Sequence, residues 1–288
     1  MEIYDLKEIP EEFKKYFQSA EIGLEKTYPE YLKKLLDVFC EVKRVMKKEG
    51  TCFINLGDSF GSGTQKTNIR APGFEKSLML IPERFAIAML DSGWILRNKL
   101  IWCKENSMPE SVQDRWKKAH EYIFFFVKNK SYYFDLDVIR TPHKQVSIDR
   151  ANYETNRLSA GRNVSSMGEK YNRDKTNRIA PEKYYSMPAR IVKLNPKGAI
   201  PPDYFLMTSG SNSGSNKEHF ATYPEKLIIP LIKAGCPEGG LVLDPFFGIG
   251  TTGVVARKLG RNFLGIEINP KYVKTAIERI TNINPMFW

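Results

Sequence analysis

The alternation of hydrophobic and polar residues predicts regular helices and strands in the first part of the chain. After Thr27, which begins a helix-capping pattern, apolar residues recur at helical spacing as far as Met46, and Gly50 stops the helix. The same reading predicts a strand over 52–57, a helix over 82–90, and strands over 95–103 and 121–127.

Regular alternation returns in the last part of the chain. It predicts a helix over 224–234, a strand over 240–244, a helix over 251–259, a strand over 262–267 and a final helix that starts near Pro270. Strand–helix–strand units of this length are typical of an α/β fold with a doubly wound, mostly parallel sheet.

The segment between these parts, 140–215, has a different character. It is rich in Asn, Ser, Arg, Lys and Tyr, shows little apolar periodicity, and is too long for an ordinary loop, so we expect it to be functional or disordered. The chain has a net charge of +11, and residues 140–197 alone carry 13 Lys and Arg against 5 Asp and Glu. This concentration is the footprint expected of a nucleic-acid contact region, although a solvated basic loop would show it too.

Composition limits the class of protein. A chain of 288 residues with 42% hydrophobic and 27% charged content fits one large globular domain, or one domain with a sizeable insertion. There is no apolar run of about 18 residues to span a membrane. The first residues do not read as a signal peptide, so we expect a cytoplasmic protein. The four cysteines form no C-x-x-C pair and there are three histidines, so we expect no metal site.

A glycine-containing turn lies between the predicted strand 240–244 and helix 251–259. Gly248 and Gly250 would let the backbone approach a ligand closely, at the strand end where α/β sheets bind ligands. Glu267 ends the next strand, where a carboxylate can accept hydrogen bonds from ribose hydroxyls. The third glycine of the dinucleotide pattern is missing, because Gly253 comes one position too soon.

The run Asp244-Pro245-Phe246-Phe247-Gly248-Ile249-Gly250-Thr251-Thr252 resembles the S-adenosylmethionine loop of DNA amino-methyltransferases. The segments 263–270 and 219–224 are similar to the family's ribose-binding segment and to the element that closes over the cofactor's methionine end. The segments 21–25, 55–60, 108–115 and 120–122 resemble its catalytic half and target-base pocket. The resemblance, closest to cytosine-N4 modification methylases, covers nearly the whole chain in circularly permuted order.

The resemblance implies the S-adenosylmethionine-dependent methyltransferase fold in three parts. These are a catalytic half (1–139), a target-recognition insert (140–215) and a cofactor-binding half (216–288). S-adenosylmethionine is the implied cofactor, and the residues implied to bind it are Asp244, Pro245, Phe246, Gly248, Gly250, Thr251, Thr252, Glu267, Asn269, His219, Phe220, Asp58 and Ser59.

The resemblance also implies that the partner is double-stranded DNA, with a cognate restriction endonuclease acting on the same site, and that the enzyme is a monomer or a dimer. Because the basic segment stands where such enzymes keep their recognition region, its cations are candidates for phosphate contacts or guanine recognition. They are Arg157, Arg162, Lys170, Arg173, Lys175 and Arg178.

One element of the family's pattern is absent from the chain. The family carries a tetrapeptide of Asp, Asn or Ser followed by Pro-Pro and an aromatic residue, which holds the target amine, and the chain's Pro201-Pro202 lies in the wrong segment. The tetrapeptide belongs at or just upstream of Met1. We expect Met1 to be an internal start; the alternatives are a decayed gene or a second chain that supplies the segment. The catalytic residues are therefore unknown.

Several functions remain open at this point. Adenine-N6 methylation shares the scaffold, and the missing tetrapeptide is where the two specificities would differ. Cytosine-C5 methylation needs a Pro-Cys nucleophile, and the chain has only the reverse order, Cys236-Pro237. A DNA-binding remnant without catalysis is a further alternative, and a nicotinamide oxidoreductase is the remotest.

Overall fold

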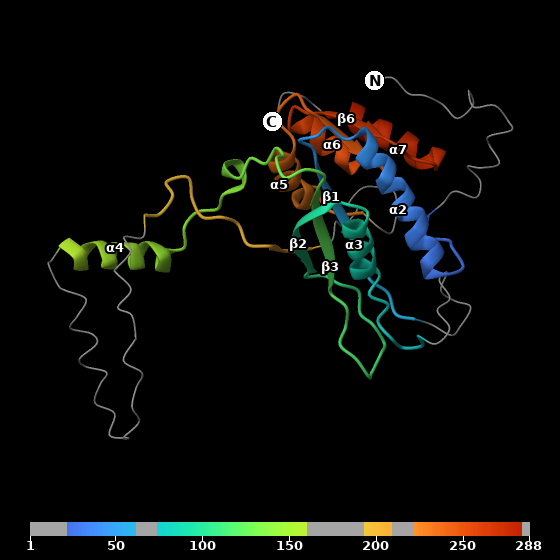
Figure 1. The fold of residues 1–288 in the computed structure, drawn as a ribbon, viewed down its shortest axis with the longest axis horizontal. Coiled ribbons are helices and arrows are strands. Elements are labelled where there is room, and N and C mark those ends of the chain that lie inside the picture. The colour runs from blue at the N-terminus through green and yellow to red at the C-terminus, as the bar shows by residue number, and fades with distance from the viewer. Residues whose placement is uncertain (1–21, 62–73, 160–192, 209–221, 284–288) are drawn as a thin grey trace. The chain divides into compact units, whose positions relative to one another are not determined.

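The computed structural model describes residues 22–61, 74–159, 193–208 and 222–283. The chain divides into two compact units, one within Met1–Val138 and Pro202–Trp288 and the other within Ile139–Pro201. Figure 1 shows the first unit as helices packed around strands. Among the described residues, no helix combines the length and the apolar character needed to span a bilayer.

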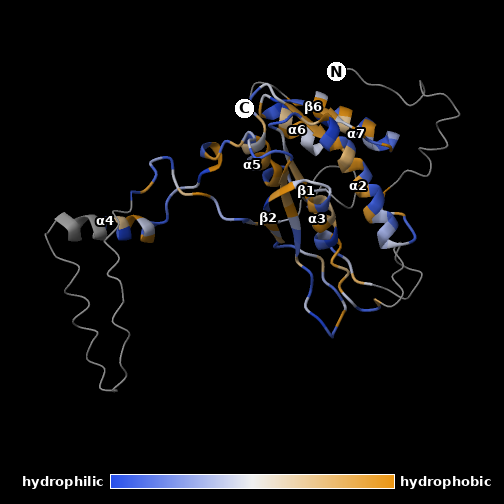
Figure 2. Cartoon of the chain, viewed as in Figure 1, coloured by the Kyte–Doolittle hydropathy of each residue, from blue (hydrophilic) through white to orange (hydrophobic). Residues whose placement is uncertain are grey.

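Helix α2 (Tyr28–Val45) begins where the capping pattern predicts. The Thr27 hydroxyl accepts a hydrogen bond from the backbone N–H of Glu30, at 3.5 Å. The buried Phe39 lies on the inner face of the helix and meets Phe85 of α3 (Ile81–Asp91) edge to face, with ring centroids 5.5 Å apart. In Figure 2, α3 is coloured largely as hydrophobic, whereas α2 mixes hydrophobic and polar residues. The mixture in α2 is typical of a helix that buries one face and exposes the other.

The larger sheet has the strand order β1-β3-β2-β4. Its strands are β1 (Thr51–Leu56), β2 (Ile95–Lys104), β3 (His120–Val127) and β4 (Tyr204–Met207). The apolar run Ile123–Val127 of β3 is buried, as befits an inner strand. Strand β3 runs antiparallel to β1 and β2, while β2 and β4 run parallel. Strands β1, β2 and β4 therefore all end at the same edge of the sheet.

The second sheet is a parallel pair, β5 (Leu241–Asp244) and β6 (Asn262–Gly265), joined by α6 (Thr251–Lys258). Helix α5 (Glu225–Gly235) precedes the pair and α7 (Pro270–Thr281) follows it. A hydrophobic cluster brings Trp102 of β2, Leu227 of α5 and Val255 of α6 together with Val242 and Phe263 of the second sheet. This shared core joins both sheets in one unit.

The observed elements confirm the helices and strands that the periodicity predicts in both regular parts of the chain, with shifts of one or two residues at their ends. The antiparallel pairings of β3 differ from the parallel pattern expected there. Strands β2 and β3 are joined by the loop 105–119 without a helix, and such a connection suits antiparallel neighbours, whereas a parallel pair needs a crossover. Parallel pairing holds for β2–β4 and β5–β6.

Two elements lie in the polar segment where no periodicity predicts them. Helix α4 (Gln145–Ser159) belongs to the second unit, and β4 adds to the first unit's sheet beside β2. In the second unit, the Arg140 guanidinium donates to the carbonyl oxygen of Gly198 at 2.9 Å, and Thr141 pairs with Ala199 in an isolated bridge. These contacts join the two ends of the second unit's chain segment.

Candidate cofactor site

The glycine turn predicted from the sequence leads from the end of β5 at Asp244 to the start of α6 at Thr251. Gly250 caps the helix with a left-handed backbone, φ 77°. A Cβ added there would stand 2.7 Å from the Cβ of Ala276 in α7, so the turn also needs the small residue for close packing.

The carboxylate of Asp244 is held inside this turn by three donors. Its Oδ1 accepts from the backbone N–H of Phe246 at 2.9 Å, and its Oδ2 accepts from the hydroxyls of Thr252 at 2.6 Å and Tyr223 at 3.3 Å. The two hydroxyls are themselves 2.6 Å apart. Burial and the nearby Asp244 charge raise the pKa of Tyr223, so its phenol stays protonated and able to donate. The network fixes the orientation of Asp244.

Glu267 ties the end of the β6 segment to the turn after β5. Its Oε2 accepts from the backbone N–H of Gly248 at 2.6 Å, and its Oε1 accepts from the N–H of Asn269 at 2.8 Å. A carboxylate oxygen can accept more than one hydrogen bond, so each oxygen keeps capacity for a further donor such as a ligand hydroxyl. The Asn269 side chain caps α7 by accepting from the N–H of Lys271 at 3.0 Å.

The aromatic and basic residues around the turn complete its support. The ring of Phe247 stacks on Phe263, with centroids 5.8 Å apart and planes at 10°. Arg279 of α7 donates to the carbonyl oxygen of Ile249 at 2.7 Å and to the hydroxyl of Thr251 at 3.1 Å. Burial lowers the pKa of the Arg279 guanidinium, because it removes water from the charged group. The two hydrogen bonds to the turn replace part of this lost hydration.

The predicted pair Asp58 and Ser59 lies in the loop after β1. The Asp58 carboxylate accepts from the backbone N–H groups of Ser59, Leu80 and Ile81, at 2.8, 3.1 and 3.0 Å. It therefore sits at the N-terminus of α3, where the helix dipole favours negative charge. The carbonyl oxygen of Ser59 accepts from the N–H of Met79. Within the described residues, no hydrogen bond joins this loop to the Asp244 turn.

A family model described as DNA methylase, and named for N6 and N4 methyltransferases, matches residues 3–278. The chain belongs to this DNA methylase family. Among curated relatives, Type II methyltransferase M.XycI of Xanthomonas campestris pv. cyanopsidis is 33% identical over 93% of this chain and 77% of its own length. Type II methyltransferase M.SmaI of Serratia marcescens is 34% identical over 92% of this chain and 79% of its own.

Solved structures share the fold of this DNA methylase. PvuII DNA methyltransferase (cytosine-N4-specific) matches with a TM-score of 0.60 at 19% identity, over 90% of this chain and 74% of that one. A putative DNA modification methylase from Thermus thermophilus, complexed with S-adenosyl-L-methionine, matches with a TM-score of 0.52 at 21% identity, over 90% and 80%. These likenesses confirm the α/β methyltransferase fold class.

The structure brings most of the predicted cofactor residues together around one turn. Asp244 to Gly250 form it, Thr251 and Thr252 begin the helix after it, and Glu267 and Asn269 follow the neighbouring strand. Pro245 lies half-buried in the turn, and Phe246 is 46% exposed beside it. The predicted residues His219 and Phe220 lie outside the described residues.

Most of the residues predicted to contact DNA lie outside the described residues. Arg157 lies in α4, and Arg162, Lys170, Arg173, Lys175 and Arg178 lie outside the described residues. Sequence reasoning placed Tyr223 in the segment 219–224 implied to lie at the cofactor, but it did not predict the contact of Tyr223 with Asp244, and it missed Arg279 altogether. Tyr223 lies just before α5 and Arg279 lies in α7, and no pattern along the chain ties either to Asp244 or Thr251.

Proposed function

We propose that this DNA methylase is the modification enzyme of a Type II restriction–modification pair. It transfers a methyl group from S-adenosylmethionine to the N4 amino group of cytosine in duplex DNA. The observation that carries the proposal is the turn Asp244–Thr252 clamped by Glu267. The Type II relatives support the modification role, and the cytosine-N4 specificity of the PvuII enzyme, which shares the fold, supports the target.

The chemistry of the turn fits the proposed cofactor. Glu267 offers acceptor capacity on both oxygens while two backbone N–H groups hold it in place, which suits the two vicinal hydroxyls of a ribose. Phe246 adds a partly exposed ring next to the turn, which suits contact with an apolar part of the ligand. We assign cofactor binding to the predicted residues around this turn, from Asp244 to Asn269.

Bound S-adenosylmethionine supplies an electrophilic methyl group on a sulfonium centre. The exocyclic amine is a weak nucleophile because its lone pair is delocalised into the ring, so the protein's contribution is to orient it. Asp244, Glu267 and the glycine turn would hold this cofactor, which would supply its methyl group to the oriented amine and leave as S-adenosylhomocysteine, with loss of one proton from the amine. Holding the two reactants in line accounts for most of the rate gain in such reactions.

The proposal is tested by methyl transfer and by cofactor binding on the same preparation. Tritiated S-adenosylmethionine and unmethylated duplex DNA should yield labelled DNA, whose nucleosides are then separated and weighed by mass spectrometry. N4-methyldeoxycytidine is expected. N6-methyldeoxyadenosine would move the proposal to the adenine enzyme of the same family, and the absence of both cofactor binding and transfer would refute it.

Glu267→Gln provides the sharpest test of the assigned site. The amide offers one acceptor oxygen, so its NH₂ group must face the backbone N–H of Gly248 or that of Asn269. We expect S-adenosylmethionine binding to weaken about 10- to 100-fold, the effect of losing hydrogen bonds to a charged acceptor. Glu278→Gln, an exposed glutamate on α7, is the matched control and should bind as the parent protein does.

The basic segment gives an independent test of DNA binding. If Arg173, Lys175 and Arg178 contact phosphates, their joint replacement by alanine should lower affinity for every duplex. The slope of log K against log salt should then fall by about 0.9 for each phosphate that is no longer neutralised. An unchanged slope would remove these three residues from the DNA interface.

A further inference from the structure

The loop 105–119 between β2 and β3 exposes an unusual side chain. Trp116 is 95% exposed, whereas the other two described tryptophans, Trp94 and Trp102, are 3% and 2% exposed. Met108 on the same loop is 84% exposed. Large apolar side chains left in water are informative when they gather on one surface, because they mark sites of interaction.

The exposed indole stands on a braced backbone. The Arg115 guanidinium donates to Glu110 Oε2 at 2.6 Å and to the carbonyl oxygen of Trp116 at 3.1 Å. The same guanidinium lies over the ring of Phe60, 3.7 Å from its centroid. Arg115 thereby ties the main chain at Trp116 both across the loop and to the segment after β1, while the indole remains in solvent.

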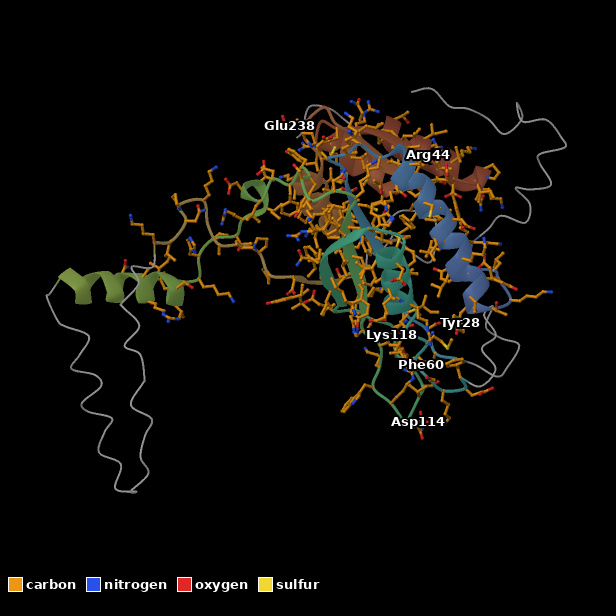
Figure 3. The ribbon with its side chains drawn as sticks, in the orientation of Figure 1. Tyr28, Arg44, Phe60, Asp114, Lys118 and Glu238 are labelled. Carbon is orange, nitrogen blue, oxygen red and sulfur yellow. The ribbon has the colours of Figure 1, made fainter. Side chains whose placement is uncertain are left out.

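Two lysines anchor the other side of the same turn. Lys118 donates to the carbonyl oxygen of Asp58, and Lys117 donates to that of Ser107 at 3.4 Å. Figure 3 labels Phe60, Asp114 and Lys118 toward the lower end of the first unit. The loop is thus held to the segment that follows β1, and so is the backbone that carries the exposed indole.

The charge around Trp116 favours an anionic partner. Arg115 is paired with Glu110, and Asp114 is paired with Lys76, so these four charges balance. Lys117 and Lys118, which follow Trp116 in sequence, remain as positive charges beside the indole. In the described part of the chain, the hydrogen bonds of both lysines end on carbonyl oxygens, which carry no full charge. This group lies beyond the ends of β1 and β2, the edge of the sheet at which α/β proteins bind their ligands.

We propose that Trp116 is a DNA-stacking residue, whose indole packs against a base of the bound duplex while Lys117 and Lys118 face its phosphates. This inference rests on the proposed function, because it needs duplex DNA as the substrate. An enzyme that acts on a base must take that base out of the stack, and an apolar side chain inserted at an opened step offsets the lost stacking. An exposed indole on a braced backbone, with Lys117 and Lys118 beside it, has the chemistry for that contact.

The first experiment follows the indole itself. Trp94 and Trp102 are buried, and replacing Trp288, which lies outside the described residues, by phenylalanine leaves Trp116 as the accessible emitter. Acrylamide should quench this emission in the free protein, and duplex DNA should both change the emission and protect it. Adding Trp116→Phe to the same background should abolish the DNA-dependent change. Unprotected emission from DNA-bound protein would overturn the inference.

The second experiment measures affinity. Trp116→Ala should weaken duplex binding about ten-fold or more, the range for removing one base–aromatic stack, whereas Trp116→Phe should retain part of the affinity. Because stacking releases no counterions, plots of log K against log salt for Trp116→Ala and parent protein should be parallel. Ile87→Ala, an exposed apolar residue on α3, is the matched control and should bind normally.

Each failure has a distinct meaning. Normal duplex affinity in Trp116→Ala would overturn the inference and leave the methylase function standing. Loss of S-adenosylmethionine binding in the same variant would show that Trp116 acts on the fold, which also overturns the inference. Failure of the parent protein to bind any duplex would overturn both the inference and the proposed function.

Discussion

Replacing Gly265 with alanine should destabilise the turn that carries the candidate cofactor site. Gly265 ends β6 directly beneath the ring of Phe247, and a Cβ added there would stand 2.3 Å from the ring's Cγ. Ordinary carbon contacts lie near 3.5–4.0 Å. Its φ lies outside the left-handed region, so the effect of the substitution is steric.

The ring has little room to move away from the new methyl group. On another side it approaches Gly253 of α6, where an added Cβ would be 2.6 Å from the ring's Cζ, and it also stacks on Phe263. Overpacking of this kind costs about 1–3 kcal/mol, and the confined ring places Gly265→Ala toward the upper end. For a chain of this size, each kcal/mol lowers the melting temperature by about 2–4 °C.

Urea unfolding followed by tryptophan emission would measure the free energy of unfolding. Gly57→Ala is the matched control, since its added Cβ would meet Glu121 at an ordinary 3.4 Å. Adding Phe247→Leu to Gly265→Ala should recover part of the loss, so the two substitutions should couple by at least about 0.5 kcal/mol. Equal stability of Gly265→Ala and Gly57→Ala, or strict additivity with Phe247→Leu, would refute the steric argument.

Three further outcomes follow from the described contacts. Tyr223→Phe removes the hydroxyl that meets Thr252 and should cost about 1 kcal/mol in urea unfolding while weakening S-adenosylmethionine binding measured by calorimetry. Burial raises the pKa of Glu25, but hydrogen bonds from a neighbouring lysine and a backbone N–H outweigh it, so the pKa lies below its usual value. The stability from Glu25 should therefore be present near neutrality and disappear as the pH falls below about 4, a loss that acid titration of Glu25→Gln should lack. Burial raises the pKa of Cys52 to about 12, so a thiol reagent at pH 8 should label the exposed Cys40 and spare Cys52 until the protein unfolds.

Hydrophobic periodicity along the sequence was enough to predict most of the described helices and strands. Helix α2 shows why: its cap at Thr27 and its apolar face are both local signals, which depend on neighbours in sequence. Helix α4 was not predicted because its sequence is strongly polar overall, and strand β4 was not predicted because it is short. Strand β4 is only Tyr204–Met207, and its pairing with β2 joins residues about a hundred positions apart in sequence.

The candidate site also has a part that the sequence predicted and a part that only the structure shows. The turn Asp244–Thr252 and Glu267 could be found from the sequence, because a ligand held between a strand end and a helix start imposes a short, ordered pattern of residues. The contacts that support that turn could not be found from the sequence. Tyr223 and Arg279 reach it from α5's N-terminal flank and from α7, and only folding brings their polar groups to Asp244 and Thr251.

By itself, the sequence determined the class of fold, the glycine turn that resembles the family's cofactor loop, and the concentration of positive charge between 140 and 197. Each of these follows from residue type and spacing along the chain, which can be read before the chain folds. The tertiary structure decided which groups satisfy one another: Glu267 with two backbone N–H groups, and Arg115 with both Phe60 and the main chain at Trp116. It also decided which tryptophan stays in water, because burial depends on how distant segments pack together.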